Sequence, residues 1–205
     1  MRRWVVAVVG VASVVVIAGC SSAEPGQPAA TASSGDPSPV LTTSRSASGG
    51  QAPPVQAALN DARLVGDPCS ALTPGQLQGI GFTAAVKTHV EHLAVGNVCS
   101  WNDDTIGTVG ASAGVVVQTT LVHGLNDIYA QRTQMAYFTP VTIEGYPAVL
   151  ADLADQRNAG TCALNLGVSN TSVLVIDYEQ QGLGPSACDT VQVLARAVVD
   201  TLRGT

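Results

Sequence analysis

The first twenty residues constrain this chain most, because they decide which part of it is left to fold and in which compartment. Arg2 and Arg3 precede an apolar stretch without a charge from Trp4 to Ile17, and the small residues Ala18-Gly19 follow it. A cationic start, a short apolar middle and a small-residue end are the three parts of a secretory signal peptide. The stretch is also shorter than the roughly 20 residues of a comfortable membrane-spanning helix. We therefore expect residues 1–19 to be a signal peptide that is removed.

A cysteine, Cys20, follows these small residues. The ending Ile17-Ala18-Gly19-Cys20 resembles the lipobox of bacterial lipoproteins, and this resemblance implies cleavage before Cys20 and a diacylglycerol thioether on its sulfur. Two acyl chains satisfy the requirement for more than one weak membrane anchor. The alternative is an ordinary signal peptide in which Cys20 is incidental. We expect a protein that is lipid-anchored at Cys20 on the extracytoplasmic face of the cell membrane.

The next segment, residues 20–62, consists mostly of Ser, Ala, Thr, Pro and Gly. Such a composition cannot bury enough apolar surface to offset the entropy of ordering the chain. We predict a disordered tether that begins at the lipidated cysteine, with a reach on the order of 35 Å. Residues 63–205 are then expected to form a single extracytoplasmic domain.

Charge excludes one class of partner. Only 12% of the residues are charged and the formal net charge is −6, which becomes more negative when Arg2 and Arg3 leave with the signal. Nucleic acid binding depends on clustered Lys and Arg that displace counterions, so nucleic acid is not expected as a partner. A polybasic contact with anionic lipid is disfavoured for the same reason, which leaves the acyl chains as the membrane attachment.

Four cysteines remain once Cys20 carries lipid: Cys69, Cys99, Cys162 and Cys188. An even number in an exported chain indicates disulfides, and three connectivities are open. We favour Cys69 with Cys99 and Cys162 with Cys188, because each bond then closes a loop worth roughly 3 to 4 kcal/mol in the chain-entropy model. The competing zinc site needs closely spaced pairs such as C-x-x-C, and the sequence has none.

Apolar periodicity predicts an α+β fold, in which an antiparallel sheet packs against a C-terminal helix and one or two shorter helices. The clearest hairpin pairs 161–168 with 171–178, and the final helix, 188–202, carries one apolar face. Thr73 and Pro74 are typical of a helix start. The other expected elements are strands over 84–93, 98–101 and 109–121, a helix over 125–136, and two short strands within 141–150.

The order of these features resembles a known family. The features are Asp67-Pro68-Cys69-Ser70-Ala71-Leu72-Thr73 at the start of a helix, Cys99-Ser100-Trp101, Val141 through Pro147-Ala148, Cys162, and Ala187-Cys188-Asp189 at the start of the last helix. They resemble the actinobacterial, largely mycobacterial, lipoproteins of domain of unknown function 3558, from about Asp67 to Arg203. The resemblance implies an exported lipoprotein with an α/β sandwich core. Its motifs are structural, so they assign no catalytic residue.

Two groups of residues invite a metal-site interpretation. His89 and His92 would share the face of a helix, but Thr88 and Val90 favour a strand, on which residues three apart point to opposite faces. His123 is expected in a loop. Asn102-Asp103-Asp104 could offer oxygen ligands to calcium, although the spaced ligands of an EF-hand are absent, and a hairpin turn is favoured. No metal or other cofactor is expected.

Two enzyme hypotheses are weaker. A glycoside hydrolase pair of Asp152 and Asp155 would need facing carboxylates at a set separation, and surface charges are the favoured interpretation. Gly110-Ala111-Ser112-Ala113-Gly114 fits the G-x-S-x-G string, but strand-forming residues follow it instead of a helix. A hydrolase that uses Ser112 therefore stays an alternative, and it requires His89, His92 or His123 as partner.

Trp101 has two interpretations. It either fills the core beside Cys99 or lines a ligand groove with Tyr129 and Tyr146. Our leading hypothesis is a non-catalytic envelope lipoprotein. It would bind an envelope ligand, such as a lipid or glycan, or dock to a membrane protein assembly.

Overall fold

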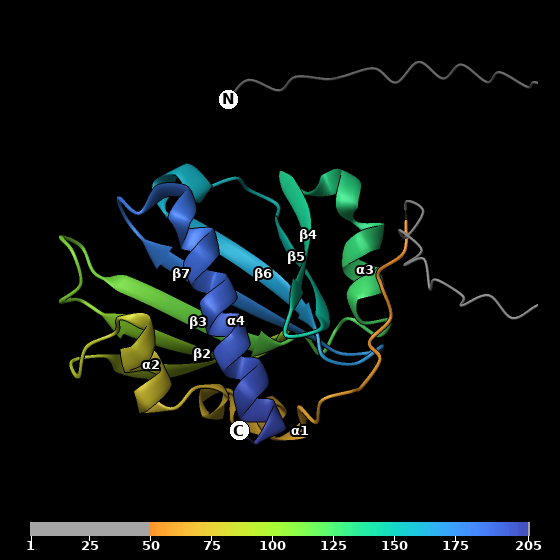
Figure 1. The fold of residues 1–205 in the computed structure, drawn as a ribbon, viewed down its shortest axis with the longest axis horizontal. Helices are drawn as coiled ribbons and strands as arrows, with labels where there is room; N and C mark the ends of the chain where they lie inside the picture. Colours follow the sequence, from red (N-terminus) through yellow and green to blue (C-terminus); the bar gives the residue numbers. More distant parts are fainter. Residues whose placement is uncertain (1–49, 205) are drawn as a thin grey trace, which may run out of the picture. The chain divides into compact units, whose positions relative to one another are not determined.

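The computed structural model describes residues 50–204, and these residues form one antiparallel sheet of seven strands with helices on both faces (Figure 1). The strand order is β1-β2-β3-β7-β6-β5-β4. The strands are β1 (Lys87–Leu93), β2 (Gly96–Asp103), β3 (Ala111–Val117), β4 (Tyr137–Ile143), β5 (Tyr146–Asp152), β6 (Thr161–Gly167) and β7 (Val173–Gln180). The predicted α+β class is confirmed. The predicted signal peptide, Cys20 and most of the predicted tether lie outside the described residues.

The helices are short except for the last. They are α1 (Ala62–Gly66), α2 (Pro74–Ile80), α3 (Leu125–Ala130) and α4 (Ala187–Arg203), with 3₁₀ turns at Pro68–Ala71, Arg132–Gln134, Arg157–Ala159 and Gly184–Ser186. The Thr73 side chain and Gln76 form a reciprocal capping box at the start of α2, and Pro74 is the first helical residue, as predicted. None of the helices within residues 50–204 is long and apolar enough to span a membrane.

The larger core lies on the face of the sheet that α4 covers, here called the α4 face. Alternate residues of the central β6–β7 hairpin point to it, and Leu164, Leu166, Leu174 and Ile176 are fully buried. The apolar stripe of α4 closes this core, with Val191, Leu194, Ala195 and Val198 all at 0% exposure. Both the hairpin and the apolar face of the last helix are thus confirmed, because two periodicities agree on the same buried surface.

The opposite face, here called the α3 face, has a smaller apolar cluster beneath α3. Leu125, Ile128 and Tyr129 of the helix pack on Val149, Ala151 and Val173 of the sheet. The helix ends at Ala130, six residues before the predicted end, and a 3₁₀ turn follows. β4 then begins at Tyr137 instead of Val141, because Pro140 lies in an edge strand, where a missing N–H is tolerated.

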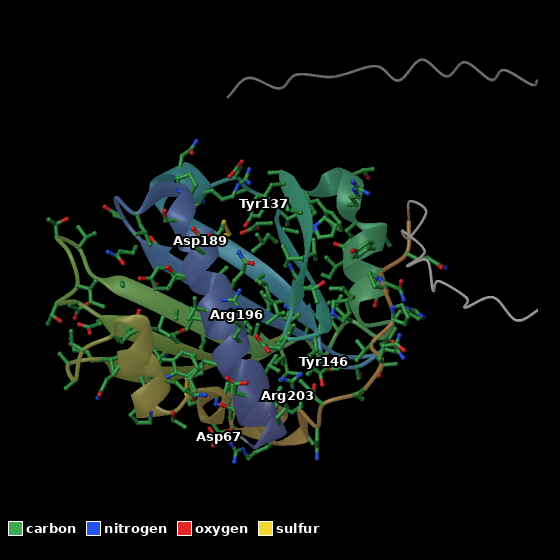
Figure 2. The ribbon with its side chains drawn as sticks, in the orientation of Figure 1. Asp67, Tyr137, Tyr146, Asp189, Arg196 and Arg203 are labelled. Atoms are coloured by element: carbon green, nitrogen blue, oxygen red, sulfur yellow. A yellow bond between two sulfur atoms is a disulfide. The ribbon has the colours of Figure 1, made fainter. Side chains whose placement is uncertain are left out.

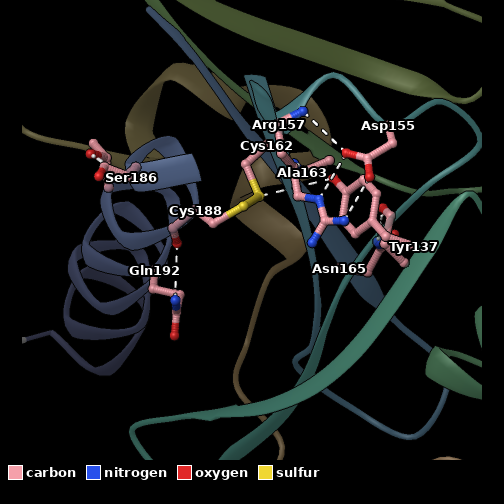
Figure 3. The surroundings of a disulfide bond; sticks show 11 residues. Tyr137, Asp155, Arg157, Cys162, Ala163, Asn165, Ser186, Cys188 and Gln192 are labelled. Carbon is pink, nitrogen blue, oxygen red and sulfur yellow. Dashed lines mark hydrogen bonds and ion pairs between the residues drawn. A yellow bond between two sulfur atoms is a disulfide. The ribbon is translucent and has the colours of Figure 1, made fainter. Parts of the chain in front are cut away.

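Both disulfides connect the sheet to elements that cover its α4 face. Cys69, in the 3₁₀ turn after α1, pairs with Cys99 of β2, and Cys188 of α4 pairs with Cys162 of β6. These are the pairings that the sequence favours. Cys99 and Cys162 are fully buried, so each bond attaches a covering element to the sheet within the core. Figure 3 shows the Cys162–Cys188 bond.

The ordered domain begins earlier than the predicted boundary at residue 63, which corrects the end of the tether. Val55 is only 8% exposed, and the Leu59 N–H donates to the carbonyl of Val168 at 2.9 Å. Ser172 donates to the Asp61 carboxylate. Composition alone missed this segment, because its backbone donors are satisfied by acceptors far away in the sequence.

Candidate functional site

A groove crosses the α3 face where the start of α3 meets the turn between β6 and β7. Gly124, which precedes α3, has φ +58°, and a Cβ atom there would lie 2.7 Å from the carbonyl oxygen of Asn170. A side chain at this position would therefore push the turn and the helix apart. The close approach places Asn126 of α3 and Asn170 of the turn on the two sides of one groove.

Residues 52–55, Ala52-Pro53-Pro54-Val55, lie in this groove, and we call them the strap. The Ala52 N–H donates to Oδ1 of Asn126 at 3.0 Å, and the Val55 N–H donates to Oδ1 of Asn170 at 2.9 Å. The two residues between them are prolines, which have no N–H to satisfy. Every backbone donor of the strap therefore has an acceptor. Figure 1 shows the strap, in orange, running past α3.

The strap also has an apolar anchor. A Cβ atom on Gly167 would lie 3.5 Å from Cγ2 of Val55 and 3.6 Å from Cβ of Leu125, so Val55 fills a notch above the glycine. Ala52 packs against the small cluster beneath α3. Burial of a valine side chain contributes about 1.5 kcal/mol or more, enough to hold a short segment but little beside the whole domain.

The strap leaves two hollows unfilled. One, of about 350 Å³, is lined by the strap, Leu125, Asn126, Ser169 and Asn170. The other, of about 230 Å³, lies on the far side of the two prolines and is lined by apolar and ring-bearing residues, namely Pro53, Pro54, Tyr129, Pro140, Val141 and Pro147, with Thr142 and Gly145. Concave surface with apolar walls and a few directed polar groups is typical of ligand sites.

The three predicted groove residues do not meet in one groove. Trp101 is 2% exposed and belongs to the core of the α4 face, which agrees with the core interpretation. Tyr146 faces the same core, and the Arg203 guanidinium of α4 lies 5.3 Å from the centre of its ring (Figure 2). Tyr129 alone lines a hollow, on the α3 face. The groove prediction is wrong for Trp101 and Tyr146, because strand parity turns them to the closed side of the sheet.

Ser112 lies at a third hollow, of about 180 Å³, where β2 and β7 end and β3 begins. Its polar walls are Asn102, Asp104, Ser112, Glu179 and Gln181. The sheet register places Ser112 opposite Asn102 on β2, whereas His89 on β1 is opposite Ser100. His89 is therefore two strands away from Ser112 and displaced along the sheet. The structure does not bring Ser112 and a histidine together within residues 50–204.

The histidines have other partners or lie in solvent. His89 and His92 are exposed on β1 and point to opposite faces, as the strand interpretation predicts. His92 Nδ1 lies 2.7 Å from Oδ1 of Asn97, and His123 Nδ1 lies 3.0 Å from Oδ1 of Asp127 in the loop before α3. In the described part of the chain, no group of three His, Cys, Asp or Glu side chains is arranged to hold a metal ion.

Two aspartates on opposite faces have opposite environments. Asp103 is fully buried, and its carboxylate accepts hydrogen bonds from Thr105 Oγ1 at 2.5 Å, Thr105 N at 3.0 Å and Thr83 N at 2.6 Å. These bonds, above all those from Thr105, hold the pKa of Asp103 far below its usual range. The turn predicted for Asn102-Asp103-Asp104 begins only at Asp104, because Asn102 and Asp103 end strand β2. The Asp103 carboxylate is already occupied by its donors, and Asp104 pairs with Lys87.

Asp177 of β7 points to the α3 face. No group within residues 50–204 donates a hydrogen bond to it. Burial raises the pKa of its carboxyl, and the negative charges of Glu179 and Asp152 raise it further. A Cβ atom on Gly114 of β3 would collide with this carboxyl. The carboxyl of Asp177 therefore occupies space that is free because residue 114 is a glycine. The α3 face thus keeps an unpaired carboxyl near its centre.

Asp155, the second aspartate of the disfavoured glycoside hydrolase pair, forms an ion pair with Arg157. Its carboxylate accepts from Arg157 Nη2 at 2.6 Å, and that side-chain bond lowers the pKa of Asp155 to about 2. The Arg157 guanidinium lies 4.4 Å from the centre of the Tyr137 ring. The Tyr137 hydroxyl lies beside Cys162 and accepts from the Ala163 N–H at 3.1 Å (Figure 3). These contacts link Asp155 through Arg157 and Tyr137 to Cys162 of the disulfide, so they give Asp155 a structural role.

Sequence reasoning missed the strap and its two asparagines. The signal was present in Ala52-Pro53-Pro54-Val55, because a pair of prolines between two N–H donors is a preformed extended segment. The two acceptors could not be found, since Asn126 and Asn170 are separated in sequence and stand in ordinary turn and helix-start positions.

Comparison with known proteins assigns the family. The model of a family described as protein of unknown function, DUF3558, matches residues 15–201. The chain belongs to this family. The match begins within the predicted signal peptide and includes the strap, so it extends well beyond the domain motifs from which the resemblance was inferred. A search of curated proteins found no match. Family membership therefore leaves the activity to be argued from the site.

Proposed function

We propose that this member of the DUF3558 family is a membrane-anchored envelope lipoprotein that works by binding and not by catalysis. The observation that carries the proposal is the groove of the α3 face, where two asparagine side chains and an apolar notch hold an extended segment. Such a site recognises a ligand by shape and backbone hydrogen bonds. The partner is an envelope ligand or a membrane protein assembly.

The surface position of the groove favours docking over storage of a ligand within the core. The hollows beside the strap are open and lie on the α3 face, whereas the residues beneath α4 are packed to 0% exposure. A lipid carrier would need an enclosed apolar cavity between sheet and helices. Anchoring through two acyl chains at Cys20 would hold the docking face within reach of proteins in the same membrane.

One experiment on the native protein tests both the anchor and the binding role. The protein is purified from its envelope, and its intact mass and any extracted small molecules are measured, with Cys20→Ala as the control. We expect an acylated mature chain with four oxidised cysteines and no stoichiometric lipid, and release of Cys20→Ala from the membrane. An unmodified Cys20 would contradict the anchor, and one bound lipid per chain would replace docking with carriage.

A hydrolase that acts through Ser112 is the second proposal, and the hollow of about 180 Å³ beside Ser112 supports it. Its weakness is the missing partner, because the nearest titratable groups in that hollow are Asp104 and Glu179 and not a histidine. Hydrolysis of a panel of acyl esters by the wild-type chain and by Ser112→Ala separates the proposals. Turnover that is lost in Ser112→Ala would favour the enzyme, and equal background rates would reject it.

A further inference from the structure

We propose that the groove of the α3 face recognises extended peptides of the form small-Pro-Pro-aliphatic, and that the strap is its resident ligand. The inference rests on the proposed docking function and names the chemistry of the partner. It follows from the way the groove holds residues 52–55, with backbone donors at both ends, two prolines between them and a valine in a notch.

The spacing of the hydrogen bonds fits one backbone conformation. Ala52 and Val55 are three residues apart, and both N–H groups donate to asparagine oxygens in the same groove. A polyproline II helix has three residues per turn, so donors three apart point to the same side. The two intervening prolines favour that helix and lower the entropy lost on binding. The groove therefore binds about one turn of a polyproline II helix.

Polar acceptors decide between a peptide and an acyl chain. Oδ1 of Asn126 and Oδ1 of Asn170 both accept a backbone N–H of the occupant. An acyl chain has no donor, so it would forfeit both hydrogen bonds and leave these exposed acceptors to water. An extended peptide satisfies both. The mode is that of proline-rich motifs in aromatic-lined grooves, and here Tyr129 supplies the aromatic wall.

The resident strap can be displaced. It fills its groove only partly, since hollows of about 350 and 230 Å³ remain on its two sides. A partner whose neighbouring side chains enter these hollows buries apolar surface that the strap leaves exposed. Gln56, Ala57 and Ala58, which follow the strap, are exposed, and the next anchor to the domain is Leu59. Residues 52–55 can therefore leave while Leu59 and the rest of the domain stay in place.

The test opens the strap in the whole mature chain and offers it the same segment as a separate peptide. The opened variant carries Pro53→Gly, Pro54→Gly and Val55→Gly; its control carries Gln56→Gly and Ala57→Gly, both exposed. The probe is a fluorescent nine-residue peptide with the sequence of residues 50–58, followed by anisotropy. A tethered strap competes at an effective concentration near the millimolar range, so we expect binding to the opened variant to be at least about tenfold tighter than to the wild type or the control.

Two further variants define the site. Asn126→Ala and Asn170→Ala, added together to the opened variant, should abolish saturable binding of the probe, as should replacing both prolines and the valine of the probe by glycine. Equal affinity for the opened variant and the wild type would overturn the proposal. So would the absence of saturable binding to the opened variant, provided that its unfolding temperature equals that of the control variant and it is therefore folded. Binding of a fluorescent fatty acid in place of the peptide would do so as well. Release of Cys20→Ala from the membrane is measured in a separate experiment. If the peptide does not bind, the proposal that the protein is a lipoprotein is therefore unaffected.

Discussion

The two faces of the sheet differ in how they are closed. The α4 face is packed with side chains at 0% exposure, and two disulfides attach its covering layer to the sheet, one from the long helix α4 and one from the 3₁₀ turn after α1. The α3 face has a six-residue helix, a four-residue strap and an unpaired aspartate. This difference teaches that stability and binding are separated in this domain. One face holds the fold together, and the other can change its occupant without loss of the core.

The largest expected effect comes from comparing a truncation in the core of the α4 face with one at a partly exposed position of the α3 face. Leu166, fully buried on the α4 face, faces Leu174 across the central hairpin. Leu166→Ala should lower the free energy of unfolding by about 4 kcal/mol, through lost burial and a cavity. Val98→Ala, at a partly exposed position on the α3 face, should lower it by about 1 kcal/mol or less. Urea unfolding measures both, and equal losses would mean that the two faces are equally packed.

Removal of a disulfide should have the next largest effect. Cys162→Ser combined with Cys188→Ser frees the start of α4 from β6, where the bond closes a sequence separation of 26 residues. Loss of that constraint on the unfolded chain predicts a decrease of about 3 kcal/mol in the free energy of unfolding. Cys69→Ser with Cys99→Ser should act similarly, since its separation is 30 residues. Unchanged unfolding of either pair would refute the claim that these bonds secure the α4 face.

The sequence specifies the closed face better than the open one. The β6–β7 hairpin and the last helix were predictable because long runs such as Thr161–Gly167 and Ala187–Arg203 keep one periodicity with one buried surface. The start of the domain was not, since Val55 is buried by contacts with Gly167 and Leu125, which lie over 65 residues away in sequence. The sequence left Trp101 open between the core and a groove shared with Tyr146, because composition does not reveal which face of a strand is covered.

The two aspartates should give opposite pH dependences. The pKa of Asp103 is lowered in the folded state, so its contribution to stability is present above the pKa of the unfolded chain and is lost as the pH falls. The pKa of Asp177 is raised, so its contribution is present at low pH and is lost as the pH rises through the folded value. Asp103→Asn should therefore destabilise the domain at pH 7, and Asp177→Asn should stabilise it there.

The measurement is thermal unfolding of both variants at pH 3 and pH 7. We expect Asp177→Asn to raise the midpoint at pH 7 by a few degrees, about 2 to 5 °C, and to leave it unchanged at pH 3, where both forms are neutral. The exposed Glu91→Gln, on the edge strand β1 and not among the charges that act on Asp177, is the matched control. A lower midpoint for Asp177→Asn at pH 7 would show that the carboxylate has a partner that stabilises its charge.

The smallest effect on global stability is expected from the strap. Val55→Asp places a charge in the notch above Gly167 and should release residues 52–55. The strap contributes to neither disulfide, and Val55 is its one residue in the larger buried cluster. The free energy of global unfolding should therefore change by about 1 kcal/mol or less. The release itself is followed by limited proteolysis between residues 50 and 58. A large drop in global stability would make the strap an integral part of the core.

The most direct test of the account is amide hydrogen exchange in the mature chain, comparing Ala52 and Val55 with Leu164 and Leu166. We predict that the two strap amides, bonded to Asn126 and Asn170, are protected but exchange much faster than the two core amides. Their exchange should be insensitive to low denaturant, as expected for local opening. Exchange of Val55 at the rate of Leu166, through global unfolding alone, would contradict an openable face, and absence of any protection at Ala52 and Val55 would contradict a docked strap.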